Sequence, residues 1–428
     1  MTFMLSFRDA EALAAHQLAG LQWTVDHAYN GNDFYRQRLA DAGVEPGSIA
    51  SLDDLARLPF TTADDLRQGY PYPLLSVPLE DVVRVHASSG TTGKRKVLAY
   101  TAQDIDDWAH MFARCYEMAG LSAADRVQIM VGYGVWTAGV GFQAGCERFG
   151  ALALPVGPGN LEMQCSFLVD FQTSVLCCTS SMALLIAEEV KRRGLKDQVK
   201  IDKVIYGSER TSQAMRERIG QALGAELFDI PGLTELYGPG TGIECPAHDG
   251  IHYWADYYIL EIIDPATLEP VAPGEVGEMV VTSLCKQAAP LIRYRTRDLC
   301  RLLPGPCACG SPLPRHGRIL GRSDDMIIFR AVNIYPGQID HVLSGVPGLG
   351  SEYQVILEHG DDGRDYMTIK VERAPEGSGD DDAGLAKAVA RGIKQQIMVS
   401  AAAEIQDYGS LPRSERKSRR IFDRREEE

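Results

Sequence analysis

The 428-residue sequence lacks both a long apolar run and an excess of positive charge. A membrane-spanning helix needs about 20 consecutive apolar residues, and no stretch approaches that length, so we expect no membrane partner. Lys and Arg number 43 against 58 Asp and Glu, for a formal net charge of −15. Because nucleic acids attract positively charged proteins, we also expect no nucleic-acid partner.

The N-terminus lacks the pattern of a secretory signal, because acidic residues come early and the apolar run is short. We therefore expect a cytoplasmic protein. Its ten cysteines would then lie in a reducing compartment, where disulfides are rare. Internal repeats are also lacking, and the basic tail at residues 413–425 is the one segment of biased composition.

What the sequence does contain is the pattern of an α/β protein. Its composition, 45% apolar and 24% charged, is that of a globular protein, and its length predicts two or more domains. Residues 1–80 look helical. Short apolar runs then alternate with helical segments, which predicts a parallel sheet covered by helices. The predicted strands lie at 127–132, 151–156, 174–179 and 203–207, and the predicted helices at 167–171, 182–194 and 212–224.

The pattern changes after residue 251, where runs joined by Pro and Gly predict antiparallel strands up to residue 303. A boundary follows near 317–325, and the remaining residues have a βαβ-like rhythm. The predicted fold class is therefore α/β. A large N-terminal domain (1–320) would combine helix-covered sheets with a β-barrel-like part, and a small α+β C-terminal domain (321–428) would form a mobile lid.

The most informative segment is HASSGTTGK, which ends in Ser88, Ser89, Gly90, Thr91, Thr92, Gly93 and Lys94. Hydroxyls, an ammonium and the backbone N–H groups of a glycine turn suit the oxygens of a polyphosphate. The glycine spacing excludes a Walker A loop. A solvated loop is the alternative, but the apolar residues at 82–85 and 96–100 favour two strands and a phosphate-binding hairpin.

This segment resembles the phosphate loop of the adenylate-forming superfamily, and its sequence is similar to that of the phenylacetate-CoA ligase family. Four further segments match that family in the same order along the chain. They are DIPGLTELYGPG (229–240), YRTRDL (294–299), GRSDDMIIFRAVNIYP (321–336) and PRSERKSRRIFD (412–423). YGSER at 206–210 is also similar to the turn that the family places beside the adenine.

The resemblance implies ATP, Mg²⁺ and coenzyme A, and it assigns a role to each matching residue. Gly207, Ser208 and Glu209 would lie beside the adenine, and Asp298 would bind the ribose diol. Thr234 and Glu235 would be catalytic, Glu235 as the Mg²⁺ ligand, since Mg²⁺ prefers carboxylate oxygen. Arg322 would lie near the ribose and phosphate, Asp324 at the hinge, and Lys417 on the reacting carboxylate and the α-phosphate.

Each of these segments also has a plainer interpretation. The segment at 229–240 could be a turn, and Asp298 could form a surface ion pair with Arg295 or Arg297. The segment at 321–336 could be an ordinary strand–turn–strand, and Lys417 a solvent-exposed lysine. The five matches in the family's order favour the functional interpretation.

Four positions depart from the family's pattern. One is Trp136, which replaces a phenylalanine and could narrow the acid pocket or suit a different acid. Pro231 replaces the tyrosine that packs on the adenine, and Tyr237 or Phe228 could compensate. Arg210 replaces a proline. Ala331 replaces a glycine on the path of the CoA arm, which leaves open an acceptor other than CoA: a carrier-protein thiol, an amine or an alcohol.

Cys245, His252, Cys307 and Cys309 match a Cys/His zinc site that some members of this family carry, and thiolates with imidazole suit tetrahedral Zn²⁺. His248 could replace His252 because a Cys-x₂-His spacing is also workable. A zinc ion here would be structural. The alternative is two unrelated loops with reduced cysteines.

Residues 132–151 resemble the family's aryl pocket. Tyr133 and Trp136 would be aromatic walls, and Gly139 and Gly141 would leave room for the acid. The alternative is that both aromatic residues belong to the core.

The resemblance thus implies an AMP-forming ligase that joins an aromatic acid, phenylacetate-like, to CoA through an acyl-adenylate. One rival passes the acyl group to a carrier protein or a small nucleophile. A second rival is a non-catalytic nucleotide-binding regulator. The sequence leaves the acid, the acceptor and the oligomeric state open, a homodimer included.

Overall fold

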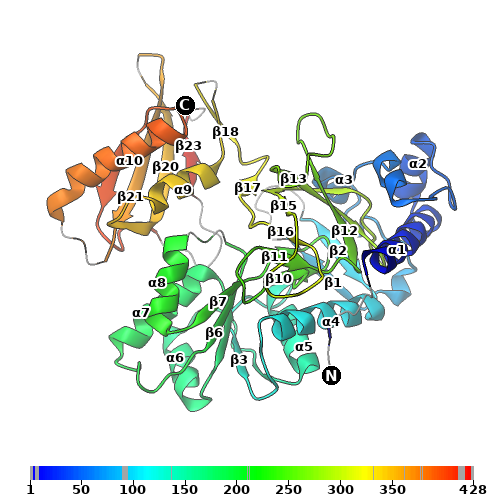
Figure 1. The fold of residues 1–428 in the computed structure, drawn as a ribbon, viewed down its shortest axis with the longest axis horizontal. Helices are drawn as coiled ribbons and strands as arrows, with labels where there is room; N and C mark the ends of the chain where they lie inside the picture. The colour runs from blue at the N-terminus through cyan, green and yellow to red at the C-terminus, as the bar shows by residue number, and fades with distance from the viewer. Residues whose placement is uncertain are drawn as a thin grey trace.

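The computed structural model describes residues 3–4, 9–88, 95–135, 137–209, 211, 213–330, 332–360, 362–375, 377, 379–412 and 420–425. The C-terminal domain stands at one end of the molecule, next to the parallel sheet, and the N-terminal helices stand at the other end (Figure 1). Within the described residues, no helix combines the length and apolar character that crossing a bilayer requires.

The chain begins with helices, as predicted for residues 1–80. They are α1 (Ala10–Gly31), α2 (Asp33–Asp41) and α3 (Ala63–Gln68), with short 3₁₀ turns η1 (Leu52–Arg57) and η2 (Leu79–Asp81). Asn32 separates α1 from α2 and caps the second helix, because its side chain accepts a hydrogen bond from the Tyr35 N–H. The Thr24 hydroxyl donates to the Ser283 carbonyl at 2.8 Å, which fixes α1 on the antiparallel part of the molecule.

The parallel sheet has five strands in the order β4-β3-β5-β6-β7. They are β3 (Arg126–Ile129), β4 (Leu152–Leu154), β5 (Val175–Cys178), β6 (Lys203–Tyr206) and β7 (Glu226–Asp229). The first four are the predicted strands, and β7 is an addition that the sequence pattern did not reveal. All four residues of β5 are buried, as expected for a central strand of a parallel sheet that is covered on both faces.

Helices connect these strands, and the three predicted ones are confirmed as α6, α7 and α8. The set comprises α4 (Ala102–Met118), α5 (Ala138–Phe149), α6 (Leu161–Asp170), α7 (Ser180–Arg192) and α8 (Gln213–Leu223). Thr101 and Asp104 form a capping box at the start of α4. The Thr179 hydroxyl caps α7, so each helix begins where its strand or turn ends.

The predicted antiparallel part consists mainly of two four-stranded sheets, in the orders β12-β13-β14-β17 and β10-β11-β16-β15. Their strands are β10 (Gly242–Glu244), β11 (Ile251–Tyr253), β12 (Tyr258–Ile263), β13 (Gly277–Ser283), β14 (Tyr294–Cys300), β15 (Leu302–Leu303), β16 (Arg315–His316) and β17 (Gly321–Arg322). Two hairpins accompany them, β1 (Arg84–Ala87) with β2 (Val97–Tyr100) and β8 (Gly232–Leu233) with β9 (Gly238–Pro239). The β1–β2 hairpin confirms the two strands predicted around the phosphate loop.

The C-terminal domain is a four-stranded sheet, ordered β22-β21-β20-β23, with two helices. Its elements are β18 (Ile327–Phe329), β19 (Val332–Ile334), α9 (Pro336–Ser344), β20 (Leu349–His359), β21 (Asp365–Arg373), η3 (Gly379–Asp381), α10 (Asp382–Gln396), β22 (Ala402–Gln406) and β23 (Ile421–Asp423). Phe329, Val355, Ile369 and Val389 are fully buried in a core that is separate from the main one. The small α+β domain is thus confirmed, while its boundary at residue 320 and its motion stay predictions.

Candidate active site

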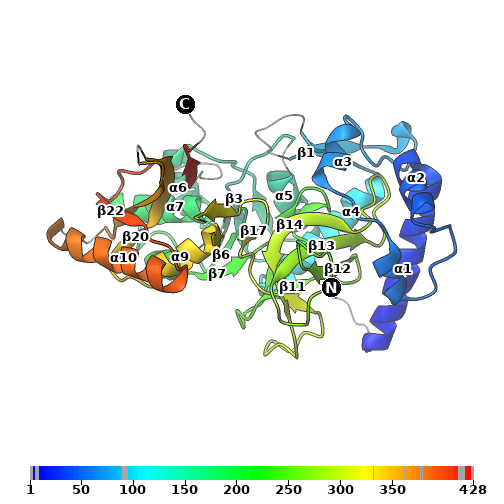
Figure 2. The same ribbon diagram turned by 90° about the horizontal axis from the view of Figure 1, so that it is seen from above.

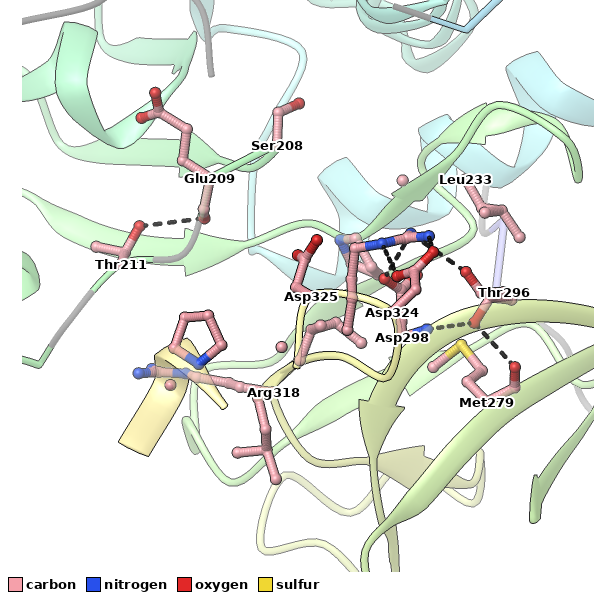
Figure 3. A pocket seen from close by; sticks show the side chains of 18 of the residues that line it. Ser208, Glu209, Thr211, Leu233, Met279, Thr296, Asp298, Arg318, Asp324 and Asp325 are labelled. Carbon is pink, nitrogen blue, oxygen red and sulfur yellow. Dashed lines mark hydrogen bonds and ion pairs between the residues drawn. The ribbon is translucent and has the colours of Figure 1, made fainter. Parts of the chain in front are cut away.

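A cleft of about 1160 Å³ opens at the carboxyl ends of the parallel strands, and residues of the C-terminal domain also line it. Ser180 follows β5, Glu209 follows β6, and Asp229 ends β7; all three line the cleft. In open α/β sheets, ligands bind in the crevice at this edge, where the strand order reverses. Figure 3 shows Ser208 and Glu209 on one side of the cleft and Asp298 and Asp324 across from them.

The structure brings together most of the described residues that the sequence assigned to the nucleotide. The cleft-lining members of that set are Ser88, Ser208, Glu209, Thr234, Glu235, Asp298, Arg322 and Asp324. Residues 89–94 and Lys417 lie outside the described residues, as do Trp136, Arg210 and Ala331. The roles of all these residues stay predictions.

Gly207 and Ser208 form the turn at which β6 enters the cleft. A methyl group at Gly207 would lie 2.3 Å from the Ile230 carbonyl oxygen, so only glycine permits this approach of the backbone to the end of β7. Ser208 has a φ of 68°, a left-handed conformation that non-glycine residues adopt mainly in turns. The turn therefore holds its residues in a fixed place at the cleft.

Glu209 contacts the N-terminus of α7. Its Oε2 accepts a hydrogen bond from the Ser181 N–H at 3.0 Å and another from the Ser180 hydroxyl at 3.2 Å. A carboxylate at this position is stabilised by the free N–H groups and the positive end of the helix dipole. In the structure, Glu209 thus ties the turn after β6 to the helix after β5.

Asp298, Arg322 and Asp324 form one charged cluster. β14 pairs with β17 so that Asp298 lies opposite Arg322. The Arg322 guanidinium binds both carboxylate oxygens of Asp324 at 2.8 Å and lies 3.4 Å from Asp298. Burial lowers the pKa of Arg322, but the contact with Asp324 and the charge of Asp298 outweigh it, so the net shift is upward. The predicted ribose and hinge residues are therefore adjacent.

Glu235 is the most buried carboxylate of the predicted site, with a side chain only 4% exposed. It forms an ion pair with the Lys96 ammonium and accepts a hydrogen bond from the Tyr294 hydroxyl at 2.9 Å. Burial alone would raise its pKa, but the charge and hydrogen bond of Lys96 outweigh burial, and the pKa lies below its usual value. Glu235 is therefore ionised and offers the hard oxygen that Mg²⁺ prefers.

The buried Lys286 supports the loop that carries Glu235. Lys286 is fully buried, donates to the Glu235 carbonyl at 2.9 Å, and lies 4.8 Å from the centre of the Tyr100 ring. Burial lowers its pKa to about 8. The Tyr100 hydroxyl donates to the carbonyls of Thr234 and Tyr237. Sequence reasoning missed Lys96 and Lys286, because both contacts join segments far apart in the chain.

A second charged network lies at the lower edge of the cleft, around Arg318 (Figure 3). Arg318 and Arg216 both donate to the buried Glu244, at 2.9 and 2.6 Å. Burial, together with the charge of Glu244, raises the pKa of the neighbouring Asp229 to about 7. No sequence signal identified this network, since no matched segment contains Arg216, Glu244 or Arg318.

The prediction that Phe228 or Tyr237 replaces the missing adenine-stacking tyrosine is wrong. Both side chains are fully buried in the core and neither lines the cleft. Phe228 packs against His248 and Lys203, while Tyr237 contacts Cys285 and Lys286. Pro231 itself lines the cleft, so its ring is the apolar surface available at that position.

The described members of the predicted acid pocket, Tyr133, Gly139 and Gly141, lie before and at the start of α5. A methyl at Gly139 would lie 2.6 Å from the Tyr133 ring, and one at Gly141 would lie 2.4 Å from Trp108. The protein's own aromatic rings therefore fill the space beside these glycines. Because Gly141 has no side chain, α4 and α5 can pack closely at that position. The Tyr133 hydroxyl is buried with no partner among the described residues.

Cys245, His252, Cys307 and Cys309 form the predicted cluster, with all four ligand atoms within 4.8 Å of one another. The two buried thiols of Cys245 and Cys307 are 3.6 Å apart, and the Cys309 sulfur lies 3.4 Å from His252 Nε2. His252 Nδ1 contacts the Leu313 carbonyl, which leaves Nε2 free to face the thiols.

His248 is not a member of this cluster. It lies between Arg216 and Glu226, at 2.8 and 3.1 Å. Between the two histidines that the sequence left open, the structure therefore favours His252. The four groups have the chemistry and spacing that tetrahedral Zn²⁺ requires.

The fold and the cleft define an adenylate-forming enzyme. The structure aligns with that of a 2-hydroxyisobutyryl-CoA ligase in the postadenylation state in complex with 2-HIB-AMP, with a TM-score of 0.87 and 26% identity over 96% of this chain and 89% of that one. ATP-bound MatB from Rhodopseudomonas palustris shares the fold with a TM-score of 0.56 and 18% identity, over 80% of this chain and 67% of that one.

The sequence comparisons identify the family within that class. Residues 22–285 match the AMP-binding enzyme family, and residues 331–425 match the AMP-binding enzyme C-terminal domain. The phenylacetate-coenzyme A ligase of Pseudomonas putida is 42% identical over 97% of this chain and 95% of that protein. The enzyme of the same name from Thermus thermophilus is 38% identical over 97% of each. The chain belongs to the phenylacetate-CoA ligase family and is an AMP-forming acid–CoA ligase.

Proposed function

We propose that this ligase activates an aromatic carboxylic acid of the phenylacetate type. The observation that carries the proposal is the identity of 38–42% with phenylacetate-coenzyme A ligases over nearly the whole chain. The 2-hydroxyisobutyryl-CoA ligase, whose named substrate is aliphatic, is more distant at 26% identity.

In the first half-reaction, a carboxylate oxygen of the acid attacks the α-phosphorus of ATP, and pyrophosphate leaves. Ser88 and the loop that follows would hold the phosphates, and Lys417 would meet the attacking carboxylate and the α-phosphate. Asp298 would accept hydrogen bonds from the ribose diol. Glu235, beside Thr234, would hold Mg²⁺, which when bound offsets the negative charge of the polyphosphate. The product is an acyl-adenylate with a good leaving group.

In the second half-reaction, the CoA thiolate attacks the acyl carbonyl and AMP leaves. The C-terminal domain would first rotate about Asp324. The postadenylation structures of the 2-hydroxyisobutyryl-CoA ligase align at a TM-score of 0.87, and the thioesterification structure at 0.71. This difference in TM-score supports the interpretation that the two domains are arranged here as in the adenylation half-reaction, and not as in thioester formation.

We also propose that the Cys245–His252–Cys307–Cys309 cluster holds a structural Zn²⁺. Cys245 and His252 lie on either side of the β10–β11 turn, and Cys307 and Cys309 lie on the loop after β15. Hydrogen bonds from the Cys309 backbone and from His252 lower the pKa of Cys307 to about 6, against the opposing effect of burial. A thiol that is ionised near neutral pH is a ready metal ligand.

The test is pyrophosphate release with MgATP over a panel of aryl, arylacetic and short aliphatic acids, with and without CoA. We expect turnover with phenylacetate-like acids that requires CoA, and loss of pyrophosphate release in Lys417→Ala. Preference for a short aliphatic acid would contradict the aromatic assignment. Release that CoA does not accelerate would favour transfer to a carrier protein or another nucleophile. Silence across the panel would favour a nucleotide-binding regulator.

A further inference from the structure

We propose that Glu278 is a positioning residue for adenylation: its buried carboxylate holds the β-bulge that directs Asp298 toward the ribose. The inference rests on the proposed role of Asp298 as the ribose ligand. Glu278 itself belongs to none of the segments that matched the family, and it is fully buried at the start of β13. It would act on the nucleotide through the geometry of the neighbouring strand β14.

The bulge lies where the pairing of β13 with β14 is interrupted. On β14, residues 296–298 lie opposite the single residue Met279 of β13, because the pairing resumes only at Leu299. An insertion of this kind bends a strand and re-aims its side chains, and it is common next to active sites. Asp298 belongs to the inserted residues and lines the cleft. The bulge therefore sets the direction of the predicted ribose carboxylate.

The bulge contains an unfavourable backbone conformation. Arg297, its middle residue, has a φ of 69°, in the left-handed region that non-glycine residues seldom adopt. Such a conformation persists only where the surrounding structure holds it. Thr296 makes two of the contacts that do so: its hydroxyl donates to the Met279 carbonyl at 2.8 Å and accepts from the Asp298 N–H at 3.0 Å (Figure 3). Further support comes from the two arginines that flank Thr296.

The Glu278 carboxylate holds both of these arginines. Arg295 donates to its two oxygens at 2.8 and 2.9 Å, and Arg297 donates to Oε2 at 3.5 Å. A bidentate pair between arginine and a carboxylate has a fixed geometry, so it holds Arg295 in one orientation. Because Glu278 is fully buried, loss of its charge would leave the arginines without compensation in a poorly solvated place.

The same carboxylate also holds the segment that faces the bulge. The Ser323 hydroxyl donates to Oε2 of Glu278 at 2.9 Å, and the Ser323 N–H donates to the Arg297 carbonyl at 2.7 Å. Ser323 directly follows Arg322, whose guanidinium lies 3.4 Å from Asp298. Glu278 thus binds the two segments that meet at the ribose carboxylate, and a change at Glu278 would move Asp298 relative to the cleft.

The test compares ATP with 3′-deoxy-ATP in acid-dependent ATP–pyrophosphate exchange. The wild type should prefer ATP. Glu278→Gln should lower the ratio of the two kcat/KM values at least about tenfold, because a misdirected Asp298 loses its charge-assisted hydrogen bonds to the ribose. Arg295→Lys should lower the ratio by a smaller factor, since lysine keeps the charge but not the bidentate contact. The KM for the acid should stay unchanged in both variants, because the predicted acid pocket lies in another segment.

The matched control is Glu261→Gln on the neighbouring strand β12. Glu261 forms the same kind of bidentate pair, with Arg293 at 3.1 and 2.9 Å, and its side chain is only 14% exposed. Among the described residues, the hydrogen bonds to its carboxylate come from Arg293 and none come from residues 296–298. Glu261→Gln should therefore lose thermal stability as Glu278→Gln does, yet keep the wild-type preference for ATP.

A wild-type ratio in Glu278→Gln would overturn the proposal, and so would a wild-type ratio in Arg295→Lys if Glu278→Gln does not fold. An equal loss of preference in Glu261→Gln would also overturn it, because general destabilisation would then be the cause. Failure of the proposed function has different signatures. A wild type without acid-dependent exchange would refute the ligase activity, and a wild-type ratio in Asp298→Asn would refute the ribose assignment.

Discussion

Asp298 shows how a single side chain connects the nucleotide site with the hinge. It lies on β14 opposite Arg322, whose guanidinium also binds Asp324. A carboxylate in this position can accept two hydrogen bonds from adjacent hydroxyls, which an amide cannot reproduce with both of its atoms. The predicted ribose contact and the predicted hinge thus share one arginine.

At the residue scale we expect Asp298→Asn to raise the KM for ATP by about 10- to 100-fold, because the substitution removes a charge-assisted hydrogen bond to the ribose. The measurement is ATP–pyrophosphate exchange with ATP and with 3′-deoxy-ATP. The wild type should discriminate strongly between the two nucleotides, and the variant should discriminate little. Equal discrimination in both proteins would place the ribose elsewhere.

Single residues also show which parts of the candidate site the sequence predicts and which it does not. Some site residues lie in recognisable sequence motifs, and the structure brings them together at one cleft: Ser88, Glu235, Asp298 and Arg322. Lys96 was missed because its partner lies 139 positions away, and no local pattern encodes such a pair. The stacking alternatives Phe228 and Tyr237 failed because aromatic residues near a motif are as suited to the core as to a ligand.

At the scale of elements, the site depends on how β6 and β7 end. The two strands run in parallel register from Lys203 and Glu226. Glu209, after β6, and Asp229, at the end of β7, line the cleft at the same edge. Alternating apolar runs and helices predicted the parallel sheet, yet β7 was overlooked. With its sequence Glu-Leu-Phe-Asp it has an acidic residue at each end, and only the middle two residues are buried.

We expect Gly207→Ala to lower the free energy of unfolding by about 1–3 kcal/mol, because the added methyl meets the Ile230 carbonyl and the backbone must shift. It should also weaken nucleotide binding. Urea denaturation and ATP binding are the two measurements. Gly317→Ala is the matched control, since its methyl would meet nothing closer than 3.4 Å. Similar stability of both variants would contradict the close approach described above.

The loops that carry the Cys/His cluster give a second prediction at this scale. Removal of bound zinc with a chelator, or Cys309→Ser, should lower the melting temperature by roughly 5–10 °C, equivalent to about 3 kcal/mol in a domain of this size. Thermal unfolding and metal analysis of the purified protein are the measurements. Cys165→Ser, a cysteine outside the cluster, is the control for chelator effects. A metal-free protein of unchanged stability would refute the zinc site.

At the scale of the whole molecule, contacts between the two domains hold the present arrangement. Figure 2 shows the C-terminal sheet and α10 at the same end of the molecule as α6 and α7 of the large domain, opposite α1 and α2. Tyr408 of the C-terminal domain donates to Glu188 on α7 and accepts from Arg218 on α8 at 2.7 Å. Arg218 and Glu188 are themselves paired at 2.8 Å. Sequence reasoning predicted the lid but not these contacts.

If the C-terminal domain rotates between half-reactions, Tyr408→Phe should favour rotation away from this arrangement. We expect the adenylation rate to fall about 3- to 10-fold, since a loss of 1.4 kcal/mol is a tenfold population change. Conversion of a preformed acyl-adenylate by CoA should not slow. Tyr366→Phe is the matched control, because its hydroxyl contacts Asp362 within the same domain. Equal slowing of both half-reactions would contradict this role.

The central claim is that the protein forms an acyl-adenylate and then a CoA thioester, and single-turnover mass spectrometry tests it most directly. The enzyme is mixed in excess with MgATP and phenylacetate, and CoA is added after the first product is detected. We predict phenylacetyl-adenylate without CoA and its conversion to phenylacetyl-CoA and AMP once CoA is present. An adenylate that persists in the presence of CoA would contradict the account.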